Sequence, residues 1–211
     1  MFSGEEFVTV KGITLSREYS STDERKLWVK LFLKGQGIVA LSSKNFMGDS
    51  EPFMWAVYNL RKKLRSKNYY VEDIDVQDDM FHIRRSRETL ITILDWTNLL
   101  LQFLPFEQPA DDLLNNLYWN MKLLAAPSLP YYLSDWRFVW KWLELWGLAP
   151  EIVDFLTSNN FNDDEIILLA KVTRLNLKDI INLLSKPISE NIRENSFKIA
   201  AKLARRFLIQ T

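Results

Sequence analysis

Two oppositely charged clusters stand side by side in this sequence, and the first has the chemistry to bind phosphates. Five basic residues fall within seven positions: Arg61, Lys62, Lys63, Arg65 and Lys67. After two tyrosines, five acidic residues fall within eight positions: Glu72, Asp73, Asp75, Asp78 and Asp79. A single-stranded nucleic acid needs a positive groove for its phosphates and aromatic rings for its bases, with stacking worth about 1–3 kcal/mol per base. The basic cluster and its tyrosines therefore predict a single-stranded DNA site.

Further cations and rings in the first part of the chain would extend this surface. The cations are Arg17, Lys26, Lys30, Lys34 and Lys44. The rings that could stack on bases are Trp28, Phe32, Tyr69 and Tyr70. Alternation along an extended strand puts Trp28, Lys30 and Phe32 on one face, which leaves open whether these two rings stack on bases or pack in a core.

A second interpretation of the charged clusters needs no ligand. Lysines at a hairpin tip keep a sheet edge from aggregating. Oppositely charged residues on neighbouring strands stabilise the pairing, so the acidic cluster would simply neutralise the basic one. An acidic surface that limits non-specific affinity for DNA is the third possibility.

Composition removes several classes of function. The chain has 211 residues, with 27 Lys and Arg against 27 Asp and Glu, so polyanion binding depends on local patches that act over a Debye length of about 8 Å. Without cysteine and with one histidine, His82, there is no thiol nucleophile, no disulfide and no multi-histidine or thiolate zinc site. The pairs Asp111-Asp112 and Asp163-Asp164 open predicted helices, where acids are stabilising without any metal. We therefore expect no enzyme activity, no cofactor and no bound metal.

The targeting features are equally sparse. The first residues are acidic and lack a long apolar stretch, unlike a secretory signal. The longest uncharged apolar region, residues 96–106, is shorter than the roughly 20 residues that a membrane span needs. We expect a cytoplasmic protein that does not enter membranes.

Residues 1–80 have the alternation and turn residues of strands. Residues 7–18 contain Gly12, which predicts a bulge or sharp bend, and the turn at residues 34–37 predicts a hairpin. Residues 53–62 and 68–76 form a second strand pair. In its last strand, alternation puts Tyr70, Glu72, Ile74 and Val76 on one face, opposite Tyr69, Val71, Asp73 and Asp75. Five short strands, one of them strongly bent, predict a small, highly curved, five-stranded antiparallel β-barrel.

Residues 81–211 change to helical spacing, so the fold class is α+β with an all-α second domain. Residues 134–147 are apolar nearly all round, which predicts a buried central helix that ends at Gly147. Asn162 and Glu165 have the spacing of a capping box. Further helices are expected at residues 176–185 and 189–208.

Four tryptophans fall within eleven residues of the central helix: Trp136, Trp140, Trp142 and Trp146. The simplest interpretation is that all four belong to the core. The alternative is an aromatic groove around Trp140 that accepts the hydrophobic end of a partner peptide, with Arg137 and Lys141 binding its carboxylates.

Three stretches resemble the bacterial recombination-mediator family RecO. "GITLSREYSSTDERKLWVKLFLKGQGIVAL" (residues 12–41) is similar to the family's first three strands, with Tyr19, Asp23 and Gly37 at its turn and hairpin positions. "EPF" (residues 51–53) stands where the family's fourth strand opens. "RFVWKWLELWGLAPEI" (residues 137–152) is similar to Arg-Phe-Glu-x-x-Leu-Leu-x-x-x-Gly-x-x-Pro-x-Leu in the family.

The resemblance implies a non-enzymatic protein of DNA repair and recombination, associated with the nucleoid. The family has an OB-fold barrel and a helical domain, binds single- and double-stranded DNA and anneals complementary strands. Its partners are RecR and the acidic-hydrophobic tail of single-strand-binding protein, for which the resemblance favours the region of Arg137.

This sequence departs from the family at two places. The four zinc-binding cysteines that many members carry after the Pro-x-Leu position are absent, so we expect a helical domain without a zinc module. The loop between the third and fourth strands, usually basic, is "SSKNFMGDSEPF" (residues 42–53) with Lys44 alone. A degenerate relative that keeps protein docking but has lost DNA binding is therefore the alternative.

Overall fold

The computed structural model describes residues 5–19, 27–43, 51–63, 69–125, 131–176 and 179–180, with the backbone alone at positions 5, 42, 43 and 63. The chain divides into two compact units. The first comprises Met1–Phe81 and Leu94–Leu114, and the second His82–Ile93 and Asn115–Thr211.

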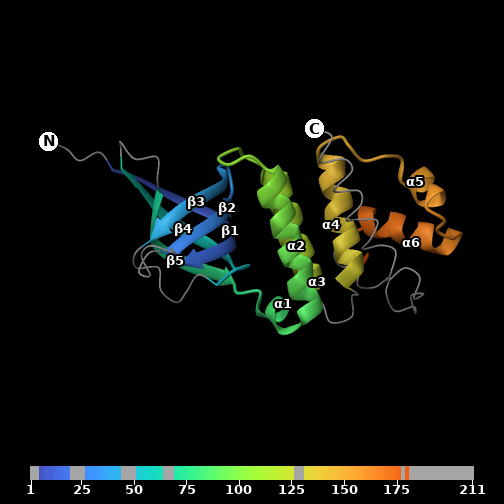
Figure 1. The fold of residues 1–211 in the computed structure, drawn as a ribbon, viewed down its shortest axis with the longest axis horizontal. Helices are drawn as coiled ribbons and strands as arrows, with labels where there is room; N and C mark the ends of the chain where they lie inside the picture. The colour runs from blue at the N-terminus through green and yellow to red at the C-terminus, as the bar shows by residue number, and fades with distance from the viewer. Residues whose placement is uncertain are drawn as a thin grey trace. The chain divides into compact units, whose positions relative to one another are not determined.

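The first unit contains one antiparallel sheet of five strands, coloured blue to green in Figure 1. The strands are β1 (Glu5–Tyr19), β2 (Leu27–Leu33), β3 (Gly37–Ser43), β4 (Trp55–Lys63) and β5 (Tyr69–Asp78), in the order β3-β2-β1-β4-β5. A sheet followed by helices confirms the predicted α+β class and the two hairpins. Among the described residues the sheet is not closed into a barrel, because β3 and β5 form no ladder.

Strand β1 is shared between two partners, and Gly12 marks the point where it changes from one to the other. Gly12 lies opposite Leu33 of β2 and opposite Ala56 of β4. A Cβ atom at this position would clash with the carbonyl oxygen of Phe32, so only glycine lets the strands approach so closely. The register then shifts between Thr14 and Ser16. The strand thus has an irregularity as predicted, but at Leu15 and not at Gly12 itself.

One face of the sheet carries the apolar core of this unit. The core cluster is formed by alternate residues of β2 and by residues of β3 and β4. It consists of Leu27, Val29, Leu31, Leu33, Val39, Leu41, Ala56, Tyr58 and Leu60. Burial of each large aliphatic side chain contributes about 1.5–3 kcal/mol, more than an exposed ion pair, so apolar alternation sets the strand register. The hydroxyls of Thr14 and Tyr58 are hydrogen-bonded at 2.8 Å inside this region. Burial raises the pKa of Tyr58 to about 12.

The predicted alternation along β5 is wrong beyond its first half. Val71 lies opposite Leu60 and Asp73 opposite Asn59, so Glu72 has no partner residue on β4. This bulge reverses the phase of the strand. As a result Val71 and Ile74, which simple alternation puts on opposite faces, both pack against the same core cluster.

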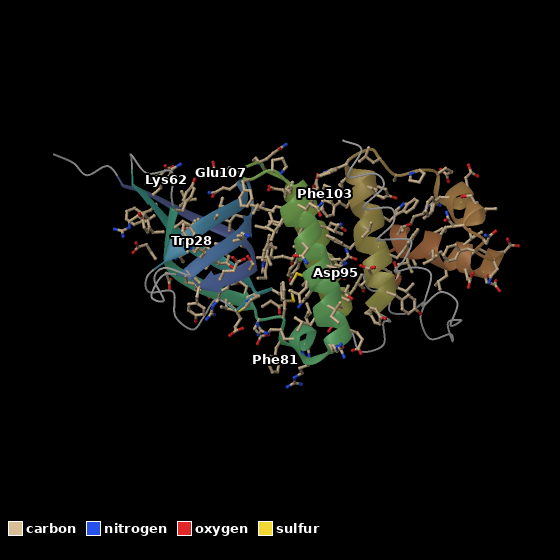
Figure 2. The ribbon with its side chains drawn as sticks, viewed as in Figure 1. Trp28, Lys62, Phe81, Asp95, Phe103 and Glu107 are labelled. Atoms are coloured by element: carbon tan, nitrogen blue, oxygen red, sulfur yellow. The ribbon has the colours of Figure 1, made fainter. Side chains whose placement is uncertain are left out.

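The β2–β3 hairpin is fastened by residues of the segment 107–111. Gly37 has a φ of 76°, and a Cβ there would clash with the backbone of Gln108. Glu107, labelled in Figure 2, donates its N–H to the carbonyl of Ile38 at 2.9 Å. Gly35 donates its N–H to Asp111 Oδ1 at 2.6 Å. This part of the β3 edge is therefore covered.

The rest of the described chain is helical, as predicted. The helices are α1 (Phe81–Arg85), α2 (Arg87–Phe103), α3 (Asp111–Leu124), α4 (Tyr131–Leu145), α5 (Ile152–Ser158) and α6 (Asp163–Arg174). The predicted helix at residues 189–208 and most of that at 176–185 lie outside the described residues. Within the described part of the chain, no helix combines the length and hydropathy needed to cross a membrane.

Two predicted helix ends are confirmed. Gly147 follows α4 with a φ of 68°, and its N–H bonds to the carbonyl of Glu144 at 3.0 Å. At the start of α6, Asn162 Oδ1 accepts from the Glu165 N–H at 3.0 Å, and Glu165 Oε2 accepts from the Asn162 N–H at 3.1 Å. Two backbone N–H groups at this helix start are therefore satisfied by side chains.

Candidate functional site

Part of the predicted DNA surface lies outside the described residues: Lys26, Lys44, Arg65 and Lys67, with only the backbone of Lys63 described. Asp23, a turn position of the family resemblance, also lies outside them. The predicted cations that the structure does place are Arg17, Lys30, Lys34, Arg61 and Lys62, and the predicted rings are Trp28, Phe32, Tyr69 and Tyr70.

These side chains do not form one cluster, because they lie beside opposite halves of β1. Arg61 lies opposite Phe7, whereas Lys30 lies opposite Ser16. Phe7 and Ser16 are nine positions apart on β1, roughly 30 Å of strand at about 3.3 Å per residue. Lys34 lies near the middle, where its N–H bonds to the carbonyl of Lys11 at 2.8 Å. The structure therefore gives two groups, one on β2 and one at the β4–β5 end of the sheet.

The β2 group lies on the face opposite the core cluster. Trp28 and Lys30 alternate with the core residues Val29 and Leu31. Trp28, labelled in Figure 2, is 40% exposed, so a base can reach part of its ring. Phe32 is fully buried, so it belongs to the interior and not to a binding surface.

Arg17 does not join Lys30. Arg17 lies opposite the core residue Val29, while the neighbouring Ser16 lies opposite Lys30, so the two cations occupy opposite faces of the sheet. The Arg17 guanidinium bonds to the hydroxyl of Tyr19 at 3.4 Å. Lys30 instead pairs with Glu18, with 3.8 Å between ammonium and carboxylate.

The β4–β5 group is held by contacts within the hairpin. The Arg61 guanidinium lies 2.6 Å from the Glu72 carboxylate. The Lys62 ammonium lies 4.8 Å from the centre of the Tyr69 ring, and Tyr69 also packs against the core cluster. A base that stacked on this face of Tyr69 would have to displace Lys62.

The remaining acidic residues of the hairpin have other structural roles. Asp73 accepts from Asn59 at 3.4 Å, and Asp75 accepts from Gln77 at 2.7 Å. Asp78 accepts the N–H of Met80 at 3.1 Å, and Asp79 that of Phe81 at 3.0 Å. The last two carboxylates thus bond to backbone donors at the entry to α1, a role that two consecutive aspartates before a helix could have indicated.

The tryptophans of α4 belong mainly to the core of the second unit. Trp136, Trp140 and Trp142 are buried, with Trp140 only 2% exposed. The rings of Trp136 and Trp140 are stacked with 4.9 Å between centroids, and Phe155 of α5 lies 5.7 Å from Trp140. Trp140 is therefore a packing residue and not an open groove wall. Trp146 is half-buried and contacts Trp142 edge-on.

Arg137 is anchored in a polar network between α3 and α4. Its Nη1 donates to Asn120 Oδ1 at 3.2 Å. Asn120 donates to the Asn116 carbonyl at 2.7 Å, and Asn116 donates to the Phe138 carbonyl at 3.0 Å. Burial lowers the pKa of Arg137, with the nearby charge of Glu144 acting in the opposite direction.

Glu144 is a residue of this region that the sequence did not single out. Its Oε2 lies 2.6 Å from the Lys141 ammonium, and its Oε1 accepts from Trp140 Nε1 at 3.0 Å. We expected the Lys141 ammonium to bind a carboxylate of a partner peptide, but it already contacts a carboxylate of the chain itself. Lys141 and Trp140 precede Glu144 by three and four residues on one helix, and this spacing could have indicated both contacts.

The described residues contain no group of three or more His, Cys, Asp or Glu side chains arranged to hold a metal ion. No protein-family model and no curated protein matches this chain.

Proposed function

We propose that this chain is a non-enzymatic mediator of the RecO type in DNA repair and recombination. In this proposal it holds single-stranded DNA, promotes the annealing of complementary strands, and docks on single-strand-binding protein and a RecR-like partner. Such a protein works in the cytoplasm, at the nucleoid.

The observation that carries the proposal is the course of β1 within the sheet. An OB fold is a five-stranded, partly open Greek-key barrel. Here β1 pairs with both β2 and β4, and the order β3-β2-β1-β4-β5 would form a closed ring if β3 met β5. Some Cα atoms of β3 and β5 lie within 8 Å. This strand order supports an OB-type barrel, with the part of β3 beyond Ile38 as the edge that would face β5.

The ligand face of such a barrel supports the choice of DNA as ligand. OB folds bind oligonucleotides on the face of the second and third strands and with the loops between strands 1 and 2 and between strands 4 and 5. In this chain that face carries the half-exposed Trp28 beside Lys30. The two connecting segments include Lys26, Arg65 and Lys67. A ring and a cation on the strand face, with basic flanking segments, suit a stacked and phosphate-bound single strand.

We propose that Arg137 and Lys141 of α4 bind the carboxylates of the partner peptide, in the region that the family resemblance favours. The Arg137 cation is partly buried, and no carboxylate of the described residues is in ion-pair contact with it. An acidic peptide end would supply that charge. Because Trp140 is buried, the peptide would meet the cations rather than the ring.

The alternative is a RecO-like protein-interaction module without DNA binding. The contacts of Lys30 with Glu18 and of Arg61 with Glu72 favour it, because both cations already have an anionic neighbour.

An annealing assay tests the proposal directly. Two complementary strands that carry a donor and an acceptor dye are mixed with and without the protein at low salt. Faster energy transfer with the protein supports a mediator. Unchanged annealing by a folded protein that still binds a single-strand-binding-protein tail peptide would support the docking module instead.

A further inference from the structure

Arg61 and Glu72 form an ion pair on the sheet, with 2.6 Å between Arg61 Nε and Glu72 Oε1. They belong to neighbouring strands, β4 and β5, on which Arg61 lies opposite Tyr70. Glu72 is the bulged residue, with no partner on β4. A residue at a bulge is released from the ladder, and bulges commonly re-aim a side chain. The carboxylate can therefore turn toward the cation.

Both side chains of the pair are partly exposed, although the Arg61 Nε atom that faces the carboxylate is itself buried. The side chain of Arg61 is 32% exposed and that of Glu72 is 42% exposed. An ion pair in such a position is screened and contributes little to folding. The register of β4 and β5 depends instead on apolar residues such as Leu60 and Val71. Exchange of the carboxylate for another anion would leave the strands in place.

We propose that Glu72 is a built-in competitor of phosphate for Arg61, and that it sets how tightly the β4–β5 end of the sheet holds a polyanion. This inference rests on the proposed function and adds a regulatory residue to it. A DNA phosphate that approaches Arg61 competes with the Glu72 carboxylate, which lies against the guanidinium at Nε. This competition weakens the binding of single-stranded DNA whatever its base sequence. Only DNA strands that also contact the other cations and rings of the sheet then stay bound.

The competition also changes the salt dependence of binding. A cation that neutralises a phosphate on a single strand releases a counterion, and the slope of log K against log salt changes by about 0.7 per contact. The displaced Glu72 carboxylate takes up a cation from solution, which offsets this release. The wild-type slope is therefore shallower than that of a protein in which position 72 is neutral.

The test compares four proteins: wild type, Glu72→Gln, Asp75→Asn and the double variant Arg61→Gln/Glu72→Gln. Asp75 is the matched control, because it lies on the same strand and accepts from Gln77, a neutral side chain, rather than from a cation. Affinity for a labelled oligonucleotide is measured by anisotropy over a salt series.

We expect Glu72→Gln to bind roughly two- to fivefold more tightly at low salt, which corresponds to the ordinary strength of an exposed ion pair. Its slope should be steeper by about 0.7. Asp75→Asn should gain less than half as much, and the double variant should lose the gain. Equal gains for Glu72→Gln and Asp75→Asn, or a gain that survives without Arg61, would overturn the inference.

The same proteins on a heparin column separate this inference from the proposed function. If none of them binds the oligonucleotide, the DNA-binding proposal fails, while the sulfated polyanion still reports on Arg61. Later elution of Glu72→Gln than of Asp75→Asn and the double variant supports the competition. Identical elution of the four proteins refutes it.

Discussion

The carboxylate of Glu144 lies 2.6 Å from the ammonium of Lys141 on the same helix. The sheet repeats this relationship between Glu18 and Lys30 at 3.8 Å and between Glu72 and Arg61 at 2.6 Å. All these side chains are partly exposed, so each pair is worth about 0.2–1 kcal/mol. The chain has 27 basic and 27 acidic residues, and some of them therefore neutralise each other in local pairs. These pairs are weak enough for a charged ligand to replace one partner.

Replacement of Trp28 by alanine should weaken binding of single-stranded DNA without unfolding the sheet. The ring lies on the face away from the core cluster and is 40% exposed. Loss of one stacked base should cost about 1–3 kcal/mol of binding free energy, as measured by anisotropy.

The matched control is Phe32→Ala, four residues along the same strand. Phe32 is fully buried, so its truncation should lower the free energy of unfolding by about 3–5 kcal/mol. A Trp28→Ala protein with normal stability and full DNA affinity would remove β2 from the binding surface.

Neutralisation of the basic cluster, residues 61–67, tests the β4–β5 group. Glutamine at Arg61, Lys62, Lys63, Arg65 and Lys67 should leave folding intact and reduce the salt slope by about 0.7 for each phosphate that is no longer neutralised. Lys62 contributes to stability through the Tyr69 ring, by about 0.5–1 kcal/mol for an exposed cation–π contact. An unchanged slope in the folded variant would exclude the cluster from the site.

The sequence allowed the general architecture to be predicted, because its period changes near residue 80 and its turns carry glycine. Gly12 and Gly37 have conformational or packing requirements that no other residue meets. The phase of β5 beyond Glu72 could not be predicted, since a bulge depends on the partner strand and not on the pattern of one strand. The contacts of Tyr69 with Lys62 and of Lys141 with Glu144 depend on side-chain directions, which spacing alone leaves open.

On α4, removal of the internal carboxylate should strengthen peptide binding. Glu144→Gln releases the Lys141 ammonium from its ion pair, so an acidic tail peptide of single-strand-binding protein should bind more tightly. Lys141→Gln should bind it less tightly, by about 0.5–1.5 kcal/mol. Titration calorimetry measures both changes. Equal affinity in the wild type and the two variants would argue against docking at Lys141.

Arg137 should behave differently from Lys141. Its hydrogen bond with Asn120 joins a buried network, so Arg137→Glu should lower the free energy of unfolding by about 1–3 kcal/mol. It should also reduce tail-peptide affinity at least about tenfold, equivalent to about 1.4 kcal/mol. A melting curve and calorimetry on one sample separate the effects. Full peptide affinity in a stable Arg137→Glu protein would contradict the docking site.

Tyr58 should contribute to unfolding at alkaline pH. Its pKa is raised from 10.0 to about 12 by burial, so the folded state holds the phenolic proton more tightly than the unfolded state. The resulting stability is complete below pH 10 and is lost as the pH rises toward 12. Tyr58→Phe should remove this part of the pH dependence in denaturant titrations. It should also cost about 1–3 kcal/mol, because the Thr14 hydroxyl loses its buried partner.

We propose that the sheet unit binds single-stranded DNA, and the anisotropy of a labelled oligonucleotide titrated with the full chain across a salt series tests this binding. We predict saturable binding at low salt that weakens linearly in log K against log salt, with a slope that corresponds to several phosphate contacts. A folded protein that leaves the anisotropy unchanged at the lowest salt would contradict the claim.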